Sequence, residues 1–306
     1  MTPKLMPLGL IALALAACGD TGASGAFKSP KGTSQVTSNT LPQTGQGNSG
    51  GVLATSSGAP AAGVEATMSY NAGGRAYGAR VDFHNGPMAG VGARCSRAGG
   101  GAGAPPECSA INASKVWLVN ELSGEYAYAG AFAVEGFGPD SNQNGLATVH
   151  SGPGMGQSRF VELPAGSASY DGRFQAGGAL THNGQTFEGR ISGNMDLAAD
   201  FASGTMSGSF NGAIIDGRSG LQAPLSAGFS NAQIGLGGRF YNTGDTTFMY
   251  GGQQAWGELD GAFYGPGAEE AAGTFGFGNA RGGMTGVMLG CDTSGATNCL
   301  LPDPRF

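Results

Sequence analysis

The chain has 306 residues, of which 60 are glycine and 15 are proline, close to a quarter of the sequence. So much glycine and proline occurs in collagen and in disordered chains, but there is no G-x-y period and hydrophobic residues still make up 40%. Charged residues are only 12%, too few for the wet faces of long amphipathic helices. The formal net charge of −6 argues against a nucleic-acid-binding protein, which would carry a basic stripe. The composition favours an all-β fold with many turns.

The first 17 residues read as a secretion signal. Lys4 supplies the basic start, and residues 8–15 form an apolar core that is too short to span a hydrocarbon layer of ~30 Å. Residues 15–18 (LAAC) then resemble the bacterial lipoprotein cleavage box, which implies lipidation of Cys18 by palmitate-type chains and stable membrane anchoring. Gly19, by the same resemblance, implies an outer-membrane location. The alternative is a plain secretory signal that happens to end at a cysteine.

The other four cysteines form two local pairs, Cys95 with Cys108 and Cys291 with Cys299. In an exported protein, this spacing predicts two disulfides that each close a short loop. Zinc binding is the competing interpretation, but the two pairs lie far apart in the sequence and no histidine pattern accompanies them. We therefore predict no metal site.

The chain divides into four predicted segments. Residues 1–17 are the signal peptide, and residues 18–60 are a Gly/Ser/Thr-rich flexible tether. Residues 61–160 form a β-rich region, and residues 161–306 form a barrel. In the β-rich region, strands are predicted at 64–70, 76–83, 115–120 and 125–134, with a long Gly/Pro insertion at 94–112.

The barrel prediction rests on short alternating strands with glycine between them. These strands are expected at residues 168–174, 186–195, 205–210, 238–241, 246–250, 254–263 and 273–277. Even spacing of this kind predicts an antiparallel barrel of about eight strands. The outward faces lack the aromatic-girdled apolar band of a transmembrane barrel, and Pro302 and Pro304 argue against a final strand at the C-terminus. The fold class is therefore an all-β protein with a soluble C-terminal barrel.

Three segments carry a resemblance to a known family. Residues 257–275 (GELDGAFYGPGAEEAAGTF) resemble the signature of transferrin-binding protein B barrel domains, while residues 163–172 and 196–208 resemble the start of that barrel and its middle hairpin. The resemblance implies a handle-like region before the barrel and a surface lipoprotein that binds ligands through barrel-end loops. The signature positions it marks as structural are Gly261, Phe263, Tyr264, Gly265, Pro266, Ala268, Glu269, Glu270, Gly273 and Phe275.

Within the signature, residues 268–272 are predicted to form one helical turn across the barrel end. Tyr264, Glu269 and Glu270 could be interpreted as an acid/base cluster, but closing and capping the barrel is the favoured role. No serine elbow outside the tether, no Cys–His pair and no H-E-x-x-H motif accompany them. We therefore expect a protein that is not an enzyme and has no cofactor.

Two functions are expected from this sequence. The first is capture of an extracellular ligand, haem or an iron-carrier protein, with a TonB-dependent receptor or a surface exporter as partner. The second is an envelope structural or accessory barrel without a soluble ligand. A ligating histidine would have to be one of His84, His150 and His182, which stand singly. Residues 140–145 (DSNQNG) match half of a calcium loop, but Ser151 replaces its closing glutamate and an ordinary turn is favoured.

Overall fold

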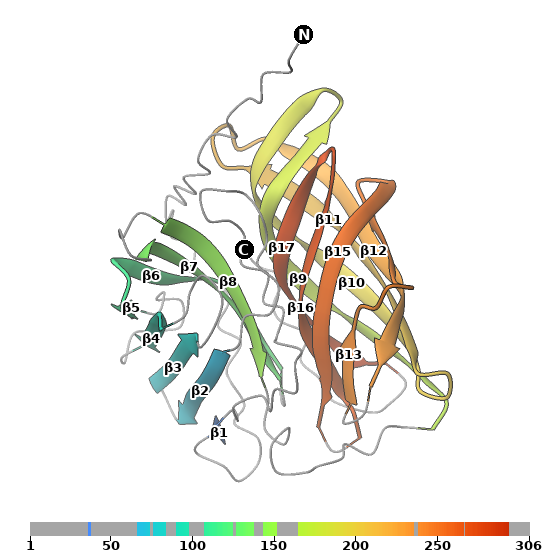
Figure 1. Ribbon diagram of the computed structural model, residues 1–306, viewed down its shortest axis with the longest axis horizontal. Helices are drawn as coiled ribbons and strands as arrows, with labels where there is room; N and C mark the ends of the chain where they lie inside the picture. Colours follow the sequence, from blue (N-terminus) through green and yellow to red (C-terminus); the bar gives the residue numbers. More distant parts are fainter. Residues whose placement is uncertain are drawn as a thin grey trace.

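A computed structural model describes residues 36–37, 66–73, 76–83, 90–97, 107–124, 127–137, 143–151, 165–235, 238–265 and 267–293. Apart from turns and one 3-10 residue, these ranges fold into three antiparallel sheets, as the all-β prediction expected (Figure 1). No helix in them is long and apolar enough to cross a bilayer. The predicted lipidation site Cys18, the predicted disulfide partner Cys299, the signature residue Pro266 and His84 lie outside the described residues.

The first sheet contains five strands that follow one another in chain order. They are β1 (Val36–Thr37), β2 (Ala66–Gly73), β3 (Ala76–Phe83), β4 (Gly92–Arg97) and β5 (Glu107–Ile111). Cys95 of β4 lies directly opposite Cys108 of β5, and the two form a disulfide. Residues 94–112 were predicted to be a loop-like insertion, but both ends of this segment belong to strands, so the prediction is wrong there. β1 comes from the segment predicted as a tether.

The second sheet, which we call the handle sheet, contains β6 (Lys115–Ser123), β7 (Tyr128–Phe137) and β8 (Gln143–Ser151). The sequence predicted the first two strands and missed β8, because Asx residues before glycine indicate a turn. The described part of the calcium-like segment instead starts β8, where Asn144 pairs with Glu135 and Gly145 with Val134. Strand pairing thus accounts for these residues.

The third sheet is a closed barrel. Its strands are β9 (Ser167–His182), β10 (Gln185–Asp200), β11 (Thr205–Asp216), β12 (Gln222–Ile234), β13 (Arg239–Tyr241), β14 (Thr247–Tyr250), β15 (Gln253–Tyr264), β16 (Glu270–Asn279) and β17 (Gly282–Asp292). β13 and β14 both lie between β12 and β15, so the nine strands fill eight places. β17 pairs with β9 and closes the ring, which confirms the predicted barrel of about eight strands.

Aromatic side chains fill the barrel interior. Phe210 contacts Phe275, Phe277 and Phe174, with ring centroids 4.8, 5.4 and 5.3 Å away. An eight-stranded barrel has an interior just wide enough for such side chains or for one small ligand. Here the described side chains occupy it as a packed core, which the inward alternation along the strands produces.

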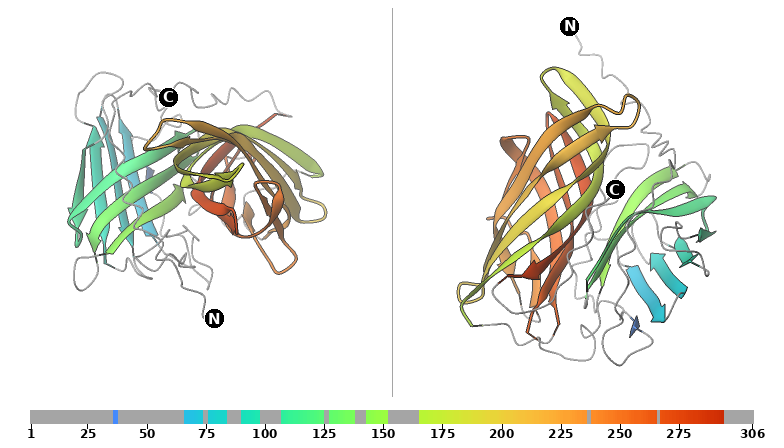
Figure 2. Two further views of the ribbon diagram at one scale, coloured as in Figure 1. Left: turned by 90° about the horizontal axis from the view of Figure 1, so that it is seen from above. Right: turned by 180° about the vertical axis from the view of Figure 1, so that it is seen from behind.

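The handle sheet packs against the outer wall of the barrel. Figure 2 shows the handle sheet and the five-stranded sheet on one side of it. Leu122, Ala129 and Ala131 of the handle sheet join one buried cluster with Val287 and Leu289 of β17. β17 therefore buries both of its faces, one in the barrel core and one against the handle sheet.

Candidate functional site

The family signature begins at β15, whose alternation divides it between two environments. Gly261 and Phe263 point into the barrel, where Phe263 contacts the rings of Tyr170, Phe201 and Phe240 at centroid distances of 5.3, 5.1 and 5.3 Å. A Cβ atom on Gly261 would lie 2.1 Å from the ring of Phe240. These inward positions fill one end of the barrel.

The turn after β15 is not helical, so the predicted helical turn over 268–272 is wrong. Gly265 and Ala268 both adopt positive φ, at 86° and 61°, and β16 already begins at Glu270. The Tyr170 hydroxyl donates a hydrogen bond of 2.8 Å to the Ala268 carbonyl. Burial, followed by the negative charges of Asp292 and Glu269, raises the pKa of Tyr170, so the phenol stays neutral and keeps donating. A main-chain turn thus closes this barrel end.

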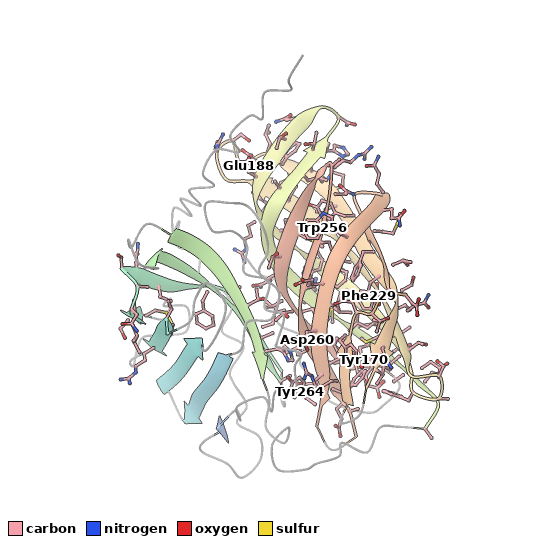
Figure 3. All side chains as sticks on the ribbon, in the orientation of Figure 1. Tyr170, Glu188, Phe229, Trp256, Asp260 and Tyr264 are labelled. Carbon is pink, nitrogen blue, oxygen red and sulfur yellow. A yellow bond between two sulfur atoms is a disulfide. The ribbon has the colours of Figure 1, made fainter. Side chains whose placement is uncertain are left out.

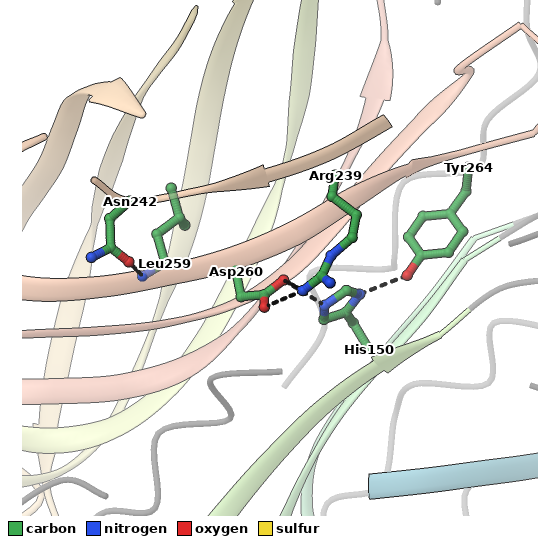
Figure 4. Close-up of polar contacts among 6 residues, drawn as sticks. All are labelled: His150, Arg239, Asn242, Leu259, Asp260 and Tyr264. Atoms are coloured by element: carbon green, nitrogen blue, oxygen red, sulfur yellow. Dashed lines mark hydrogen bonds and ion pairs between the residues drawn. The ribbon is translucent and has the colours of Figure 1, made fainter. Parts of the chain in front are cut away.

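The outward positions of β15 form a polar cluster with the handle sheet (Figure 4). Both terminal carboxylate oxygens of Asp260 accept from one guanidinium nitrogen of Arg239, at 3.1 and 2.7 Å. His150 of β8 lies between them and Tyr264. Its Nδ1 is 2.6 Å from the Tyr264 hydroxyl, and its Nε2 is 3.7 Å from Asp260 Oδ1. The cluster therefore joins three strands, β8, β13 and β15.

The carboxylate determines how His150 is protonated when the imidazole is neutral. A hydrogen on Nε2 points towards the negative charge of Asp260, whereas a lone pair there would be repelled. Nδ1 is then left to accept a hydrogen bond from the Tyr264 hydroxyl. His150 is fully buried, and it lies in a strand and not in a loop.

Glu270, the last residue of the turn, also faces the handle sheet. Its carboxylate accepts a hydrogen bond of 2.7 Å from the main-chain amide of Ala127. The turn that presents this amide is closed by a hydrogen bond from Gly124 N to Ala127 O, and a Cβ atom on Gly124 would lie 2.3 Å from the carboxylate. Glu269 behaves differently, because its carboxylate accepts from Gly267 N within its own turn. The two adjacent glutamates therefore have separate partners.

Tyr264 and Glu270 were expected to cap the barrel end, and they lie instead at the junction with the handle sheet. The sequence pointed to neither Arg239 nor Asp260, and it did not link His150 with them. The sequence did hold one signal that another sheet covers this side of the barrel. Residues 271–278 of β16 and 284–290 of β17 are apolar on both faces, and such runs indicate strands that are buried on both sides.

The described part of the chain contains no group of three or more His, Cys, Asp or Glu side chains that could hold a metal ion. His182 is the last residue of β9, and it makes none of the contacts described for the cluster around His150. Cys291 is disulfide-bonded, and Cys299, its predicted partner, is outside the described residues. The junction therefore consists of hydrogen bonds between two packed sheets, beside an ion pair within the barrel.

Comparison with known proteins agrees with the fold. Residues 163–291 match the family described as the C-lobe and N-lobe beta barrels of Tf-binding protein B. The barrel is therefore similar to the barrels of transferrin-binding protein B, as its signature indicated. A search of curated proteins found no match.

Several solved structures are similar at low identity. A transferrin-binding protein B variant from Actinobacillus pleuropneumoniae is 16% identical, with 59% of this chain and 82% of that chain covered and a TM-score of 0.34. The N-lobe of lactoferrin-binding protein B from Moraxella bovis is 16% identical, with coverages of 58% and 79% and a TM-score of 0.35. A structure described as a surface lipoprotein is 18% identical, with coverages of 57% and 81% and a TM-score of 0.33.

Proposed function

We propose that this protein is a lipid-anchored, non-catalytic binding module of the outer membrane that captures an extracellular ligand at the cell surface. The observation that carries the proposal is the combination of the lipoprotein box ending at Cys18 with a barrel of the transferrin-binding protein B type. In this proposal residues 1–17 are the signal, residues 18–60 the tether, and residues 61–160 and 161–306 the handle-like region and the barrel.

The packing of the barrel supports a ligand bound on the outside. Its interior is occupied by large aromatic side chains, including Phe174, Phe210 and Phe275, so the space that holds a ligand in wider barrels is filled here. The hairpin turns and the outer wall are left to make contacts. Loops held by a rigid scaffold commonly carry binding residues in proteins.

The described junction supports a non-catalytic role. Asp260 pairs with Arg239 on the neighbouring barrel strand and lies 3.7 Å from His150 of the handle sheet, and Glu270 accepts from the amide of Ala127, so both carboxylates have structural partners. The proposed ligand is haem or an iron-carrier protein, since the similar proteins are described as binding transferrin and lactoferrin. A TonB-dependent receptor or a surface exporter is the proposed partner. An envelope structural barrel without a soluble ligand is the alternative.

The anchor and the ligand can be tested separately. Mass spectrometry of the mature protein should find acyl chains on Cys18, and a Cys18→Ala variant should lose them and leave the membrane fraction. Titration of the purified full chain with haemin, iron-loaded transferrin and lactoferrin tests the ligand class. Saturable binding of one of them would support capture. Binding of none, by an acylated and folded protein, would favour the envelope role.

A further inference from the structure

Trp256 on the outer wall of the barrel is one of two tryptophans in the chain, and it is 55% exposed. It lies on β15 well away from Asp260 and Tyr264, which face the handle sheet (Figure 3). Its indole covers Gly278 of the neighbouring strand, because a Cβ atom there would lie 2.3 Å from Cζ2 and 2.8 Å from Cε2 and Cη2 of the ring. The indole therefore lies across the sheet and leaves a large part of its surface open to solvent.

Two planar polar side chains flank this ring on the same strand. Side chains two residues apart share a face of a strand and are about 7 Å apart, so Gln254 and Glu258 lie on either side of Trp256. Gln254 is exposed. Glu258 is half-buried, and burial raises the pKa of its carboxyl; its Oε2 is itself buried and has no hydrogen-bond partner. The outward face of β15 thus presents an amide, an indole and a carboxylate in a row.

The surroundings of the indole are uncharged over a long stretch. Residues 246–257, which include β14 and the first part of β15, contain no Asp, Glu, Lys or Arg. Met249 is exposed at 45% and pairs with Gln254 across the hairpin. The cation on the next hairpin, Arg281, donates a hydrogen bond to the Gly251 carbonyl. This part of the wall therefore favours an uncharged ligand.

We propose that Gln254, Trp256 and Glu258 form a binding site for the ring of a neutral sugar. The C–H face of a sugar ring packs on an indole, whose face carries partial negative charge. A ring stacked there places its hydroxyl groups towards both flanking side chains. The Glu258 carboxylate can then accept from a sugar hydroxyl, and the Gln254 amide can both donate and accept.

A protein partner and haem fit this surface less well. Protein interfaces usually bury about 800 Å² per partner around several apolar anchors, whereas Trp256 and Met249 stand among Gln, Thr and Gly residues. Haem carboxylates would need cations, and the flanking charged group is Glu258. The inference names a ligand class for the outward-facing module and rests on the proposed function only for its exposure to extracellular sugars.

The test is calorimetric titration of the purified full chain with neutral maltohexaose, cellohexaose and chitohexaose. We expect saturable binding of at least one, weakened about tenfold or more by Trp256→Ala, which removes the stacking surface. Trp256→Phe should retain part of the affinity, and Glu258→Gln should weaken it. Leu221→Ala, which truncates an exposed apolar residue on another hairpin, is the matched control and should bind like the unmodified protein. Circular dichroism melting of each variant verifies folding.

A second arm distinguishes the two sources of sugar. A glycoprotein carrying neutral glycans is titrated before and after enzymatic deglycosylation, beside the free oligosaccharides. Loss of binding on deglycosylation supports glycan recognition, whereas binding that persists would mean that the protein surface is recognised and would overturn the proposal. Absence of saturable binding to every probe, or equal binding by folded Trp256→Ala, would also overturn it. If no sugar binds but haemin or an iron-carrier protein binds equally well to the unmodified protein and to Trp256→Ala, the proposed function is supported and the sugar site is overturned.

Discussion

The carboxylate of Glu270 in the barrel accepts a hydrogen bond of 2.7 Å from the main-chain amide of Ala127, 143 residues earlier in the chain. Both groups are buried between the barrel and the handle sheet. A buried amide that loses its acceptor keeps its full desolvation cost. The contact therefore stabilises the docking of the two sheets, and it gives the second glutamate of the family signature a physical role.

Removal of this acceptor should loosen the handle sheet. We expect Glu270→Ala to lower the free energy of docking by about 1–3 kcal/mol, because the Ala127 amide is left without its partner. Hydrogen exchange of the Ala127 amide, followed by mass spectrometry of the 122–131 peptide, measures the effect. Glu269→Ala is the matched control, since Glu269 bonds within its own turn. Equal exchange in both variants would contradict the assignment.

The Arg239–Asp260 pair should contribute more than an exposed pair. Their N–O distance is 2.7 Å and their side chains are 21% and 4% exposed. Removing one partner of a buried pair typically costs 3–5 kcal/mol, and the partial exposure of Arg239 places Asp260→Ala near the lower end, about 3 kcal/mol. Arg218→Ala breaks the exposed pair with Glu188 and should cost about 0–1 kcal/mol. Urea unfolding compares the two, and similar midpoints would refute the contrast.

The absence of a side chain at Gly261 should matter to the barrel core. A Cβ atom there would lie 2.1 Å from the Phe240 ring and 2.8 Å from the Ala272 carbonyl. Because overpacking a core typically costs 1–3 kcal/mol, we expect Gly261→Ala to lower the melting temperature clearly. Gly244→Ala serves as control, since nothing lies within 4 Å of its added Cβ. An unchanged melting temperature for Gly261→Ala would show that the core can relax around the methyl group.

Asp216 should make stability depend on pH in the acid range. Hydrogen bonds from the Ser219 hydroxyl, from the Glu188 amide and from the Ser219 and Arg218 amides lower the pKa of its carboxyl below the ordinary value of 3.8. A lowered folded-state pKa stabilises the fold above about pH 4, and this contribution is lost as the pH falls from there towards the folded-state pKa.

The variant Asp216→Asn isolates this contribution. It should be less stable than the unmodified protein at pH 7, and the difference in unfolding free energy should stay constant down to about pH 5 and shrink below pH 4. Urea unfolding at several pH values measures it. A difference that grows on acidification would reverse the assigned sign.

Local alternation made most of the barrel predictable. Phe187, Ile191 and Met195 recur on one face of β10, and all three are buried as that pattern indicates. β12 was missed because Pro224 lacks the amide that a ladder needs and because its inward positions include the small Ala223 and Ala227. β17 was missed because its glycines read as loop residues.

The junction with the handle sheet was beyond local patterns. His150 comes from a strand far in the sequence from those of Arg239 and Asp260, and nothing in the neighbours of each residue identifies its partner. Their proximity depends on where the handle sheet packs, which tertiary contacts decide. The helical turn expected from the run Ala268 to Ala272 was overridden in the same way, because pairing of β16 with β15 and β17 satisfies its main chain from Glu270 onward.

The central claim is that the folded module faces outward from the cell on a lipid anchor. Protease shaving of intact cells tests it most directly, with a periplasmic protein as the leakage control and the Cys18→Ala variant as the unanchored control. The account predicts that the module is removed from intact cells while the periplasmic protein survives. Survival of the module until the outer membrane is opened would contradict surface display and place the protein in the periplasm as a carrier or structural component.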